Sequence, residues 1–105
     1  ITSIINEENI QGSIDLKNKS HIDSIINSGT IEKGINLEKS TIGSITNNEG
    51  AKADLDLKNN SVVGTITNNG DMLITRDETS SIGKFANKGS LKNTFENKDI
   101  LGTLE

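Results

Sequence analysis

The sequence repeats itself at intervals of 19 to 21 residues, and this period limits the chain to a few architectures. Most copies read as a hydroxyl residue, an apolar residue, a third residue that varies, and asparagine. The copies begin at residues 3, 24, 44, 65, 84 and 103, and the last is only started. A unit this short cannot bury an apolar face alone, so such repeats stack on one another as solenoids, propellers or arrays.

Other positions recur in step with this pattern. An apolar residue precedes each later copy at Ile22, Ile42, Val63, Ile82 and Leu101, and serine stands two residues earlier at Ser20, Ser40, Ser61 and Ser80. Glycine follows the apolar position at Gly43, Gly64, Gly83 and Gly102, and a second glycine position comprises Gly29, Gly50, Gly70 and Gly89. Because the chemistry at each position is nearly constant, equivalent residues are expected to lie above one another in successive coils.

Within each copy the apolar residues alternate in short bursts between turn-forming residues, which is typical of strands. One such set is Ile14/Leu16, Ile35/Leu37 and Leu55/Leu57. In the next copy, Ile74/Arg76, the second position is no longer apolar. No window carries the spacing of an amphipathic helix. The sequence therefore predicts an all-β parallel β-helix (β-solenoid), right-handed, with about five coils of three short strands each. Residues 1–105 are expected to form a single solenoid segment of a longer β-helix, because the chain begins with Ile1 rather than Met.

The composition indicates a folded chain with an unusually thin hydrophobic core. Hydrophobic residues make up only 30% of the chain, and there is no Cys, Pro, Trp or Tyr, yet 16 residues are isoleucine. Disordered segments are depleted in such β-branched residues. The net charge of −4 and the lack of a basic stripe argue against nucleic acid as a partner. Apolar runs are far too short for a membrane-spanning helix, so none is predicted.

An asparagine recurs once per coil at an equivalent place, and it is the main candidate for a special role. The column comprises Asn6, Asn27, Asn47, Asn68 and Asn87. A side-chain amide both donates and accepts, so stacked copies can form a structural ladder that also satisfies the backbone of the turns. A polar strip that touches a ligand is the alternative interpretation. We favour the ladder.

No residues assemble into a recognisable catalytic, cofactor-binding or metal site. His21 is the only histidine and falls in an outward position of a strand. Calcium-binding β-rolls have a nine-residue period, which this chain lacks. Asp15, Asp54 and Asp56 alternate with apolar residues and are expected to face solvent. We therefore predict a non-enzymatic protein with no cofactor.

The segments Ile25–Ile31 (IINSGTI) and Gly64–Gly70 (GTITNNG) resemble the I-x-N-x-G-x-I repeats of bacterial autotransporter passengers, particularly vacuolating-cytotoxin-like and adhesin-type passengers. The resemblance covers essentially the whole chain, although the alternating apolar set fails at Arg76. It implies a right-handed parallel β-helix that is secreted through the outer membrane and displayed on the bacterial cell surface. The resemblance assigns no functional residue in this sequence.

The expected function is that of a structural and binding solenoid, extracellular or on the bacterial surface, active in adhesion or self-association. Its expected partners are a host-surface protein or glycan, or another copy of the chain that binds through the solenoid faces or ends. Unpaired strand edges on the first and last coils favour concentration-dependent association. The alternatives are an ice- or surface-binding solenoid, which needs a regular threonine face, and a polysaccharide-active β-helix enzyme.

Overall fold

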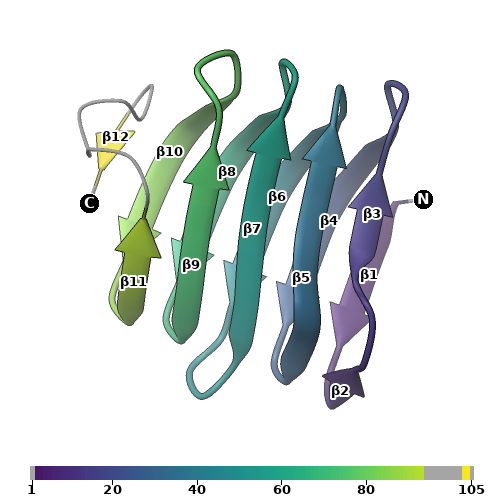
Figure 1. The fold of residues 1–105 in the computed structure, drawn as a ribbon. Helices are drawn as coiled ribbons and strands as arrows, with labels where there is room; N and C mark the ends of the chain where they lie inside the picture. The colour runs from purple at the N-terminus through teal and green to yellow at the C-terminus, as the bar shows by residue number, and fades with distance from the viewer. Residues whose placement is uncertain (1, 94–102, 105) are drawn as a thin grey trace.

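The computed structural model describes residues 2–93 and 103–104, and these residues form strands and turns (Figure 1). The strands are β1 (Ser3–Asn6), β2 (Asn9–Ile10), β3 (Ile14–Leu16), β4 (His21–Asn27), β5 (Thr30–Glu38), β6 (Thr41–Asn47), β7 (Lys52–Lys58), β8 (Val62–Asn68), β9 (Asp71–Arg76), β10 (Ser81–Asn87), β11 (Ser90–Asn93) and β12 (Thr103–Leu104). The described residues include no helix long and apolar enough to cross a membrane.

The strands build two parallel sheets that face each other. Sheet A has the order β1-β4-β6-β8-β10-β12. Sheet B has the order β11-β9-β7-β5-β2, and β3 also pairs with β5. The chain alternates between the two sheets and completes four turns from Ser3 to Lys84 before a fifth begins. The predicted all-β solenoid is confirmed.

The winding is right-handed, as predicted. In Figure 1 the chain descends in sheet A at the back, crosses below to sheet B, and ascends in front. Each cycle shifts it from the N-terminal side towards the C-terminal side. A viewer who looks along the axis from the N-terminus sees the chain turn clockwise as it recedes, which defines a right-handed solenoid.

The predicted alignment of the repeats matches the register of sheet A. Backbone pairing stacks the apolar residue of each copy on its equivalent in the next, in the series Ile4, Ile25, Ile45, Ile66, Phe85 and Leu104. The expectation of three short strands per coil was wrong for most coils. Among the residues that the structure describes, only the first coil has three, β1, β2 and β3, whereas the second to fourth coils merge the second and third into one strand, as in β5. Leu101 and Gly102 lie outside the described residues.

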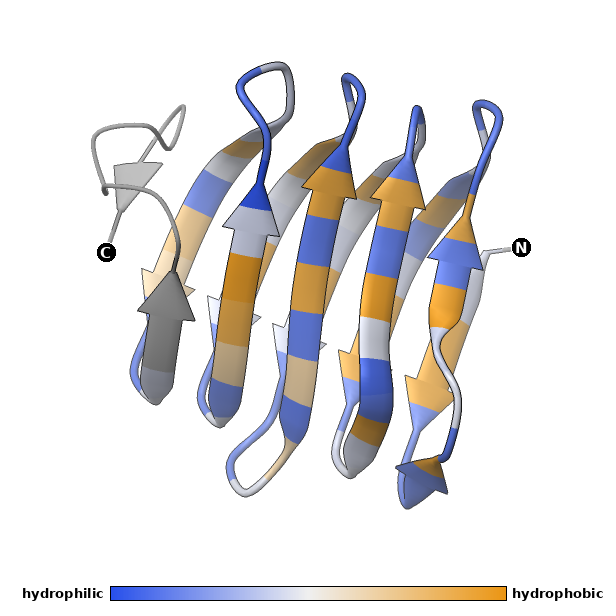
Figure 2. Cartoon of the chain, viewed as in Figure 1, coloured by the Kyte–Doolittle hydropathy of each residue, from blue (hydrophilic) through white to orange (hydrophobic). Residues whose placement is uncertain are grey.

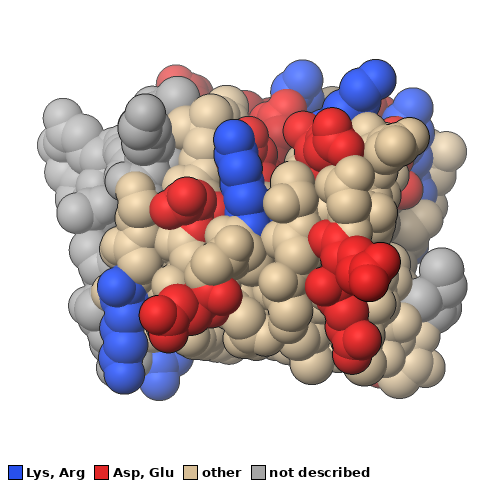
Figure 3. Space-filling model, turned by 90° about the horizontal axis from the view of Figure 1, so that it is seen from below, with Lys and Arg blue, Asp and Glu red and all other residues tan. Residues whose placement is uncertain are grey.

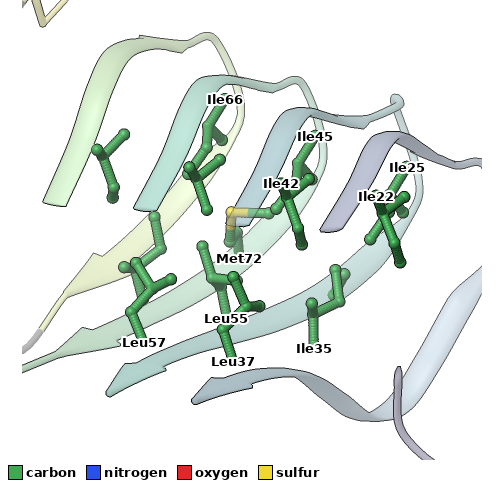
Figure 4. Packing of buried hydrophobic residues seen from close by; sticks show 14 of the residues in the cluster. Ile22, Ile25, Ile35, Leu37, Ile42, Ile45, Leu55, Leu57, Ile66 and Met72 are labelled. Atoms are coloured by element: carbon green, nitrogen blue, oxygen red, sulfur yellow. The ribbon is translucent and has the colours of Figure 1, made fainter. Parts of the chain in front are cut away.

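The core is a narrow double layer between the two sheets. Ile22, Ile42, Val63 and Ile82 of sheet A are buried, as are Ile35, Leu55 and Ile74 of sheet B. In Figure 4 Ile22 and Ile42 of sheet A and Ile35 and Leu55 of sheet B project into the space between the sheets, with Met72 among them. In Figure 2 strand β7 and the last part of β5, from Ile35 to Glu38, alternate between polar and apolar residues, because only every second side chain faces inwards. One inward residue per two strand positions is enough, which explains the low apolar content.

Arg76 interrupts the alternating apolar set because it binds a turn instead of filling the core. It pairs in register with Leu57, so an apolar residue was expected there. Its Nη1 donates hydrogen bonds to the carbonyl oxygens of Asp77 (3.1 Å) and Ser80 (2.8 Å). The guanidinium thus satisfies polar backbone atoms of the turn that follows β9.

The glycines after the apolar position are needed for close packing of successive coils. A Cβ atom added to Gly64 would lie 2.6 Å from the carbonyl oxygen of Gly43, and one added to Gly83 would lie 2.6 Å from that of Gly64. Neither residue has a positive φ. The close approach of neighbouring backbones therefore selects glycine in this column.

The second glycine column is aligned differently from the prediction at one place. Gly50 does not stack on Gly29; its φ is 81° and it lies in a turn. Ala51 takes the equivalent position, since the N–H of Lys52 bonds to the carbonyl of Gly29 and the N–H of Asp71 to that of Ala51. The third coil has two more residues between its ladder asparagine and this position than the second coil has. It accommodates them as a turn, and the ladder of backbone hydrogen bonds continues.

Candidate functional site

The asparagine column forms a continuous side-chain ladder along the turn between sheets A and B. The Nδ2 of each member donates to the Oδ1 of the next, with distances of 2.8 Å (Asn6 to Asn27), 2.9 Å (Asn27 to Asn47), 2.9 Å (Asn47 to Asn68) and 2.8 Å (Asn68 to Asn87). The three central members, Asn27, Asn47 and Asn68, have no exposed surface. A ligand cannot reach them, so the ladder is structural.

The amides of Asn6, Asn27, Asn47 and Asn68 also bind the start of the sheet B strand in the next coil. The Nδ2 of Asn47 donates to the carbonyl oxygen of Asp71 at 3.0 Å, and the Nδ2 of Asn27 donates to that of Lys52 at 3.0 Å. One side chain therefore links two coils by two routes. This explains why the turn keeps its shape while the residues around it vary.

A second ladder, of serine residues, lies at the opposite turn. The Oγ of Ser40, Ser61 and Ser80 each accepts from the backbone N–H of the equivalent serine one coil earlier, at 3.2, 3.3 and 3.1 Å. The Oγ of Ser61 also donates to the carbonyl of Lys58 at 2.7 Å. The sequence shows the recurring serines but not this role, which depends on how the coils stack.

The turns beside the serine ladder contain residues in the left-handed region. Asn59 and Asn60 have φ values of 56° and 64°, which asparagine tolerates better than most residues. Asp77 of the following coil holds this turn: its Oδ2 accepts from the N–H of Asn59 at 2.7 Å, and its Oδ1 accepts from the N–H of Thr79 at 3.1 Å. The hydrogen bond from Asn59, more than any other cause, lowers the pKa of Asp77 to about 2.

We expect Asp77 to stabilise the last described coils in a pH-dependent way. Its pKa in the folded protein is lower than the usual 3.8, so its contribution is complete above about pH 4 and is lost as the pH falls towards 2. In urea denaturation monitored by circular dichroism, Asp77→Asn should lose less stability than the parent protein between pH 5 and pH 2. Parallel pH profiles would contradict this assignment.

His21 lies on the outer face of sheet A and connects β4 with β6. Its Nδ1 is 2.7 Å from the Oγ1 of Thr41, and its Nε2 is 2.7 Å from Oδ1 of Asp23. Hydroxyl, imidazole and carboxylate thus follow the order found in nucleophilic triads. However, the side chains of His21 and Asp23 are 54% and 61% exposed on an open strand surface. Such a triad also needs oxyanion donors in a site that excludes water, so we assign this cluster to the contact between coils.

The outer surface of sheet B is charged. Here called the charged face, it carries Asp15, Glu32, Lys33, Asn36, Glu38, Lys52, Asp54, Asp56, Lys58 and Asp71. Asn36 Nδ2 donates to Asp15 Oδ1 at 2.9 Å, and this hydrogen bond is the main cause that lowers the pKa of Asp15. Within the described ranges, no three His, Cys, Asp or Glu side chains are grouped as metal ligands would be.

The turn edge of the molecule also carries both signs of charge. Figure 3 looks at the molecule from below, where sheet A runs into sheet B, and shows acidic and basic side chains close to one another among uncharged residues. On the charged face, Asp56 Oδ2 lies 3.5 Å from Lys58 Nζ, while its buried Oδ1 has no hydrogen-bond partner. These surfaces suit contact with water and ions better than a dry interface.

The outer surface of sheet A has the opposite character. Here called the neutral face, it comprises the half-exposed or exposed residues Ile5, Ser24, Ile26, Thr41, Ser44, Thr46, Val62, Thr65, Thr67 and Ala86. On its central strands, β6 and β8, no outward side chain is ionisable. The charged side chains that adjoin it, Asp23 and Lys84, belong to β4 and β10, on either side of these strands.

Comparisons with family models, with curated proteins and with solved structures found no match for this chain. The functional argument therefore depends on the geometry and surface chemistry of the solenoid. The resemblance of Ile25–Ile31 and Gly64–Gly70 to autotransporter passengers stays a prediction. The residues that a partner can contact lie on the two outer faces, because the asparagine ladder is buried.

Proposed function

We propose that this chain is a structural and binding segment of a bacterial protein that is secreted or displayed on the cell surface. It makes many weak lateral contacts, either with a host-surface protein or glycan or with another copy of itself. The autotransporter-like repeats support the bacterial surface as its location. In this proposal the solenoid core holds the faces rigid, and the faces do the binding.

The observation that carries the proposal is the segregation of charge between the two sheets. The outward positions of β7 are two aspartates between two lysines, whereas those of β6 and β8 present only glycine, hydroxyl groups and valine. Monomeric proteins generally intersperse charges over their surfaces, and the centres of interfaces are depleted of them. The neutral face therefore fits a contact surface, and the charged face supports solubility.

Repetition makes weak contacts useful. Each coil presents nearly the same outward groups about 4.8 Å from the previous one, because that is the spacing of neighbouring strands. When one coil is bound, the next is held close to its own partner group, so linked sites gain avidity without new kinds of contact. A monomer is thus expected to bind weakly, and a dense array of copies strongly.

The proposal can be tested with beads densely coated with the full chain. We expect the beads to be retained on epithelial cell layers, or to cluster with each other, at least tenfold more than uncoated beads. The variant Thr46→Lys/Thr67→Lys should lose this retention, because it adds two charges to the neutral face. Beads coated with Leu73→Lys/Thr75→Lys, which adds the same charges to β9 of sheet B, should bind like the parent.

Two results would contradict the proposal. Coated beads that neither adhere to the cells nor cluster would show that the chain has no binding face of this kind. Equal loss of binding in both double variants would show that added charge acts nonspecifically. The chain in solution, at concentrations where it is monomeric, should be retained far less than the beads.

A further inference from the structure

The neutral face is large enough and flat enough to meet another sheet. It spans strands β1, β4, β6, β8 and β10, and the four later ones each contain seven residues. At about 4.8 Å between strands and about 3.3 Å per residue, its area is roughly 550 Å². Two such faces would bury roughly 1,100 Å² in total, slightly above the ~1,000 Å² that a specific interface needs. This area fits a weak, reversible dimer.

We propose that the neutral face packs against the neutral face of a second copy, with the two copies related by a twofold axis near β6. This inference rests on the proposed binding function and names one partner for it. Sheets that pack face to face lie about 10 Å apart and interdigitate their side chains. Threonine, serine, isoleucine and alanine are small enough to do so, and on the central strands β6 and β8 there are no charges to desolvate.

The distribution of charge favours this arrangement over the other lateral contacts. A twofold axis near β6 places Thr46 close to its own equivalent and sets β4 of one copy opposite β8 of the other. No ionisable outward residue lies on β6 or β8, so the centre is neutral. Asp23 on β4, whose Oδ1 lies 2.7 Å from His21 Nε2, and Lys84 on β10 lie on either side of this centre. Packing through the charged faces would instead bring Asp54 and Asp56 of both copies together, and like charges would repel.

The neutral face also carries exposed apolar side chains that a second sheet would cover. Ile5 and Val62 are 63% and 39% exposed, and both belong to strands of sheet A. Of the three large apolar residues that are most exposed among those described, only Leu73 belongs to sheet B. Burial of apolar surface drives association, so these residues favour the same face as the charge pattern does.

Sedimentation equilibrium of the full chain from 10 µM to 1 mM tests the proposal. The weight-average mass should rise from 11.2 kDa towards twice that value and stop there, because a twofold contact closes. Thr46→Lys/Thr67→Lys should raise the dissociation constant at least tenfold. Leu73→Lys/Thr75→Lys, on sheet B, should leave it unchanged. Circular dichroism checks that each variant folds, and Ser44→Lys serves as a milder second variant.

Three results would overturn the inference. A parent chain that stays monomeric at 1 mM would refute the dimer, while adhesion of the coated beads to cells would leave the binding function standing. Association that persists in both Thr46→Lys/Thr67→Lys and Ser44→Lys would assign it to the strand edges at the ends of the solenoid. Mass that continues to grow beyond the dimer would indicate open stacking rather than a closed pair.

Discussion

Asn47→Asp is expected to lower the free energy of unfolding by about 3–5 kcal/mol at neutral pH, the range for an uncompensated buried charge. The Asn47 side chain is fully buried, and its Nδ2 donates to Asn68 Oδ1 and to the carbonyl oxygen of Asp71. A carboxylate in this place has no hydrogen to donate, so both acceptors would lose their hydrogen bond and would face a negative charge. Asn47→Ala should cost less, about 1–3 kcal/mol, because it leaves unpaired partners but no charge.

The pH dependence separates this explanation from simple loss of packing. Burial among acceptors raises the pKa of the introduced carboxyl group above its usual value, so the group becomes protonated as the pH falls from 7 towards 4. It can then donate one hydrogen bond, and part of the loss should be recovered. Urea denaturation at pH 7 and pH 4 measures this. Asn48→Asp is the matched control, since it makes the same change one residue later at a half-exposed side chain that bonds only to Ser28. Similar losses for Asn47→Asp and Asn48→Asp would mean that the ladder contributes little.

Gly64→Ala is expected to lower the free energy of unfolding by about 2–3 kcal/mol, within the range for overpacking. Its new Cβ would lie 2.6 Å from the carbonyl oxygen of Gly43, which belongs to backbone and cannot move like a flexible side chain. The two coils would have to separate locally, which strains the hydrogen bonds between β6 and β8. The midpoint of urea denaturation should fall, and thermal unfolding should follow it.

Gly12→Ala provides the control for this substitution. A Cβ at Gly12 would have no atom within 4 Å, and the φ of this residue is not positive. The change should therefore alter stability by less than about 0.5 kcal/mol. Equal effects of Gly12→Ala and Gly64→Ala would show that the glycine column is not selected by the approach of neighbouring coils.

The asparagine ladder could be predicted because it depends only on the period. A solenoid with nearly constant coil length must place Asn27, Asn47 and Asn68 one above another, and an amide column can satisfy itself only by bonding along the axis. The same reasoning fixed the pairing of Ile25 with Ile45. Residues that lengthen one part of a coil are harder to place, because the sequence does not show where the extra residues leave the stack. The alignment of Gly50 with Gly29 failed for this reason.

Contacts between different positions of neighbouring coils could not be predicted. Asp77 binds the N–H of Asn59 because one turn lies directly over the other, and His21 meets Thr41 because β4 and β6 pair in register. These residues belong to different columns or carry different chemistry, so the repeat pattern does not link them. The serine ladder is intermediate: its column is visible in the sequence, but its hydrogen-bond direction is not.

By itself the sequence determined that this chain winds into stacked coils with a column of asparagines, because a fixed period and alternating apolar residues leave a stack of strands as the way to bury a thin core. The tertiary structure decided that there are two sheets, and which residues of each face outwards. That choice depends on where the chain bends between β4 and β5, which sets the inward side of every strand. The separation of a neutral face from a charged face follows from this geometry.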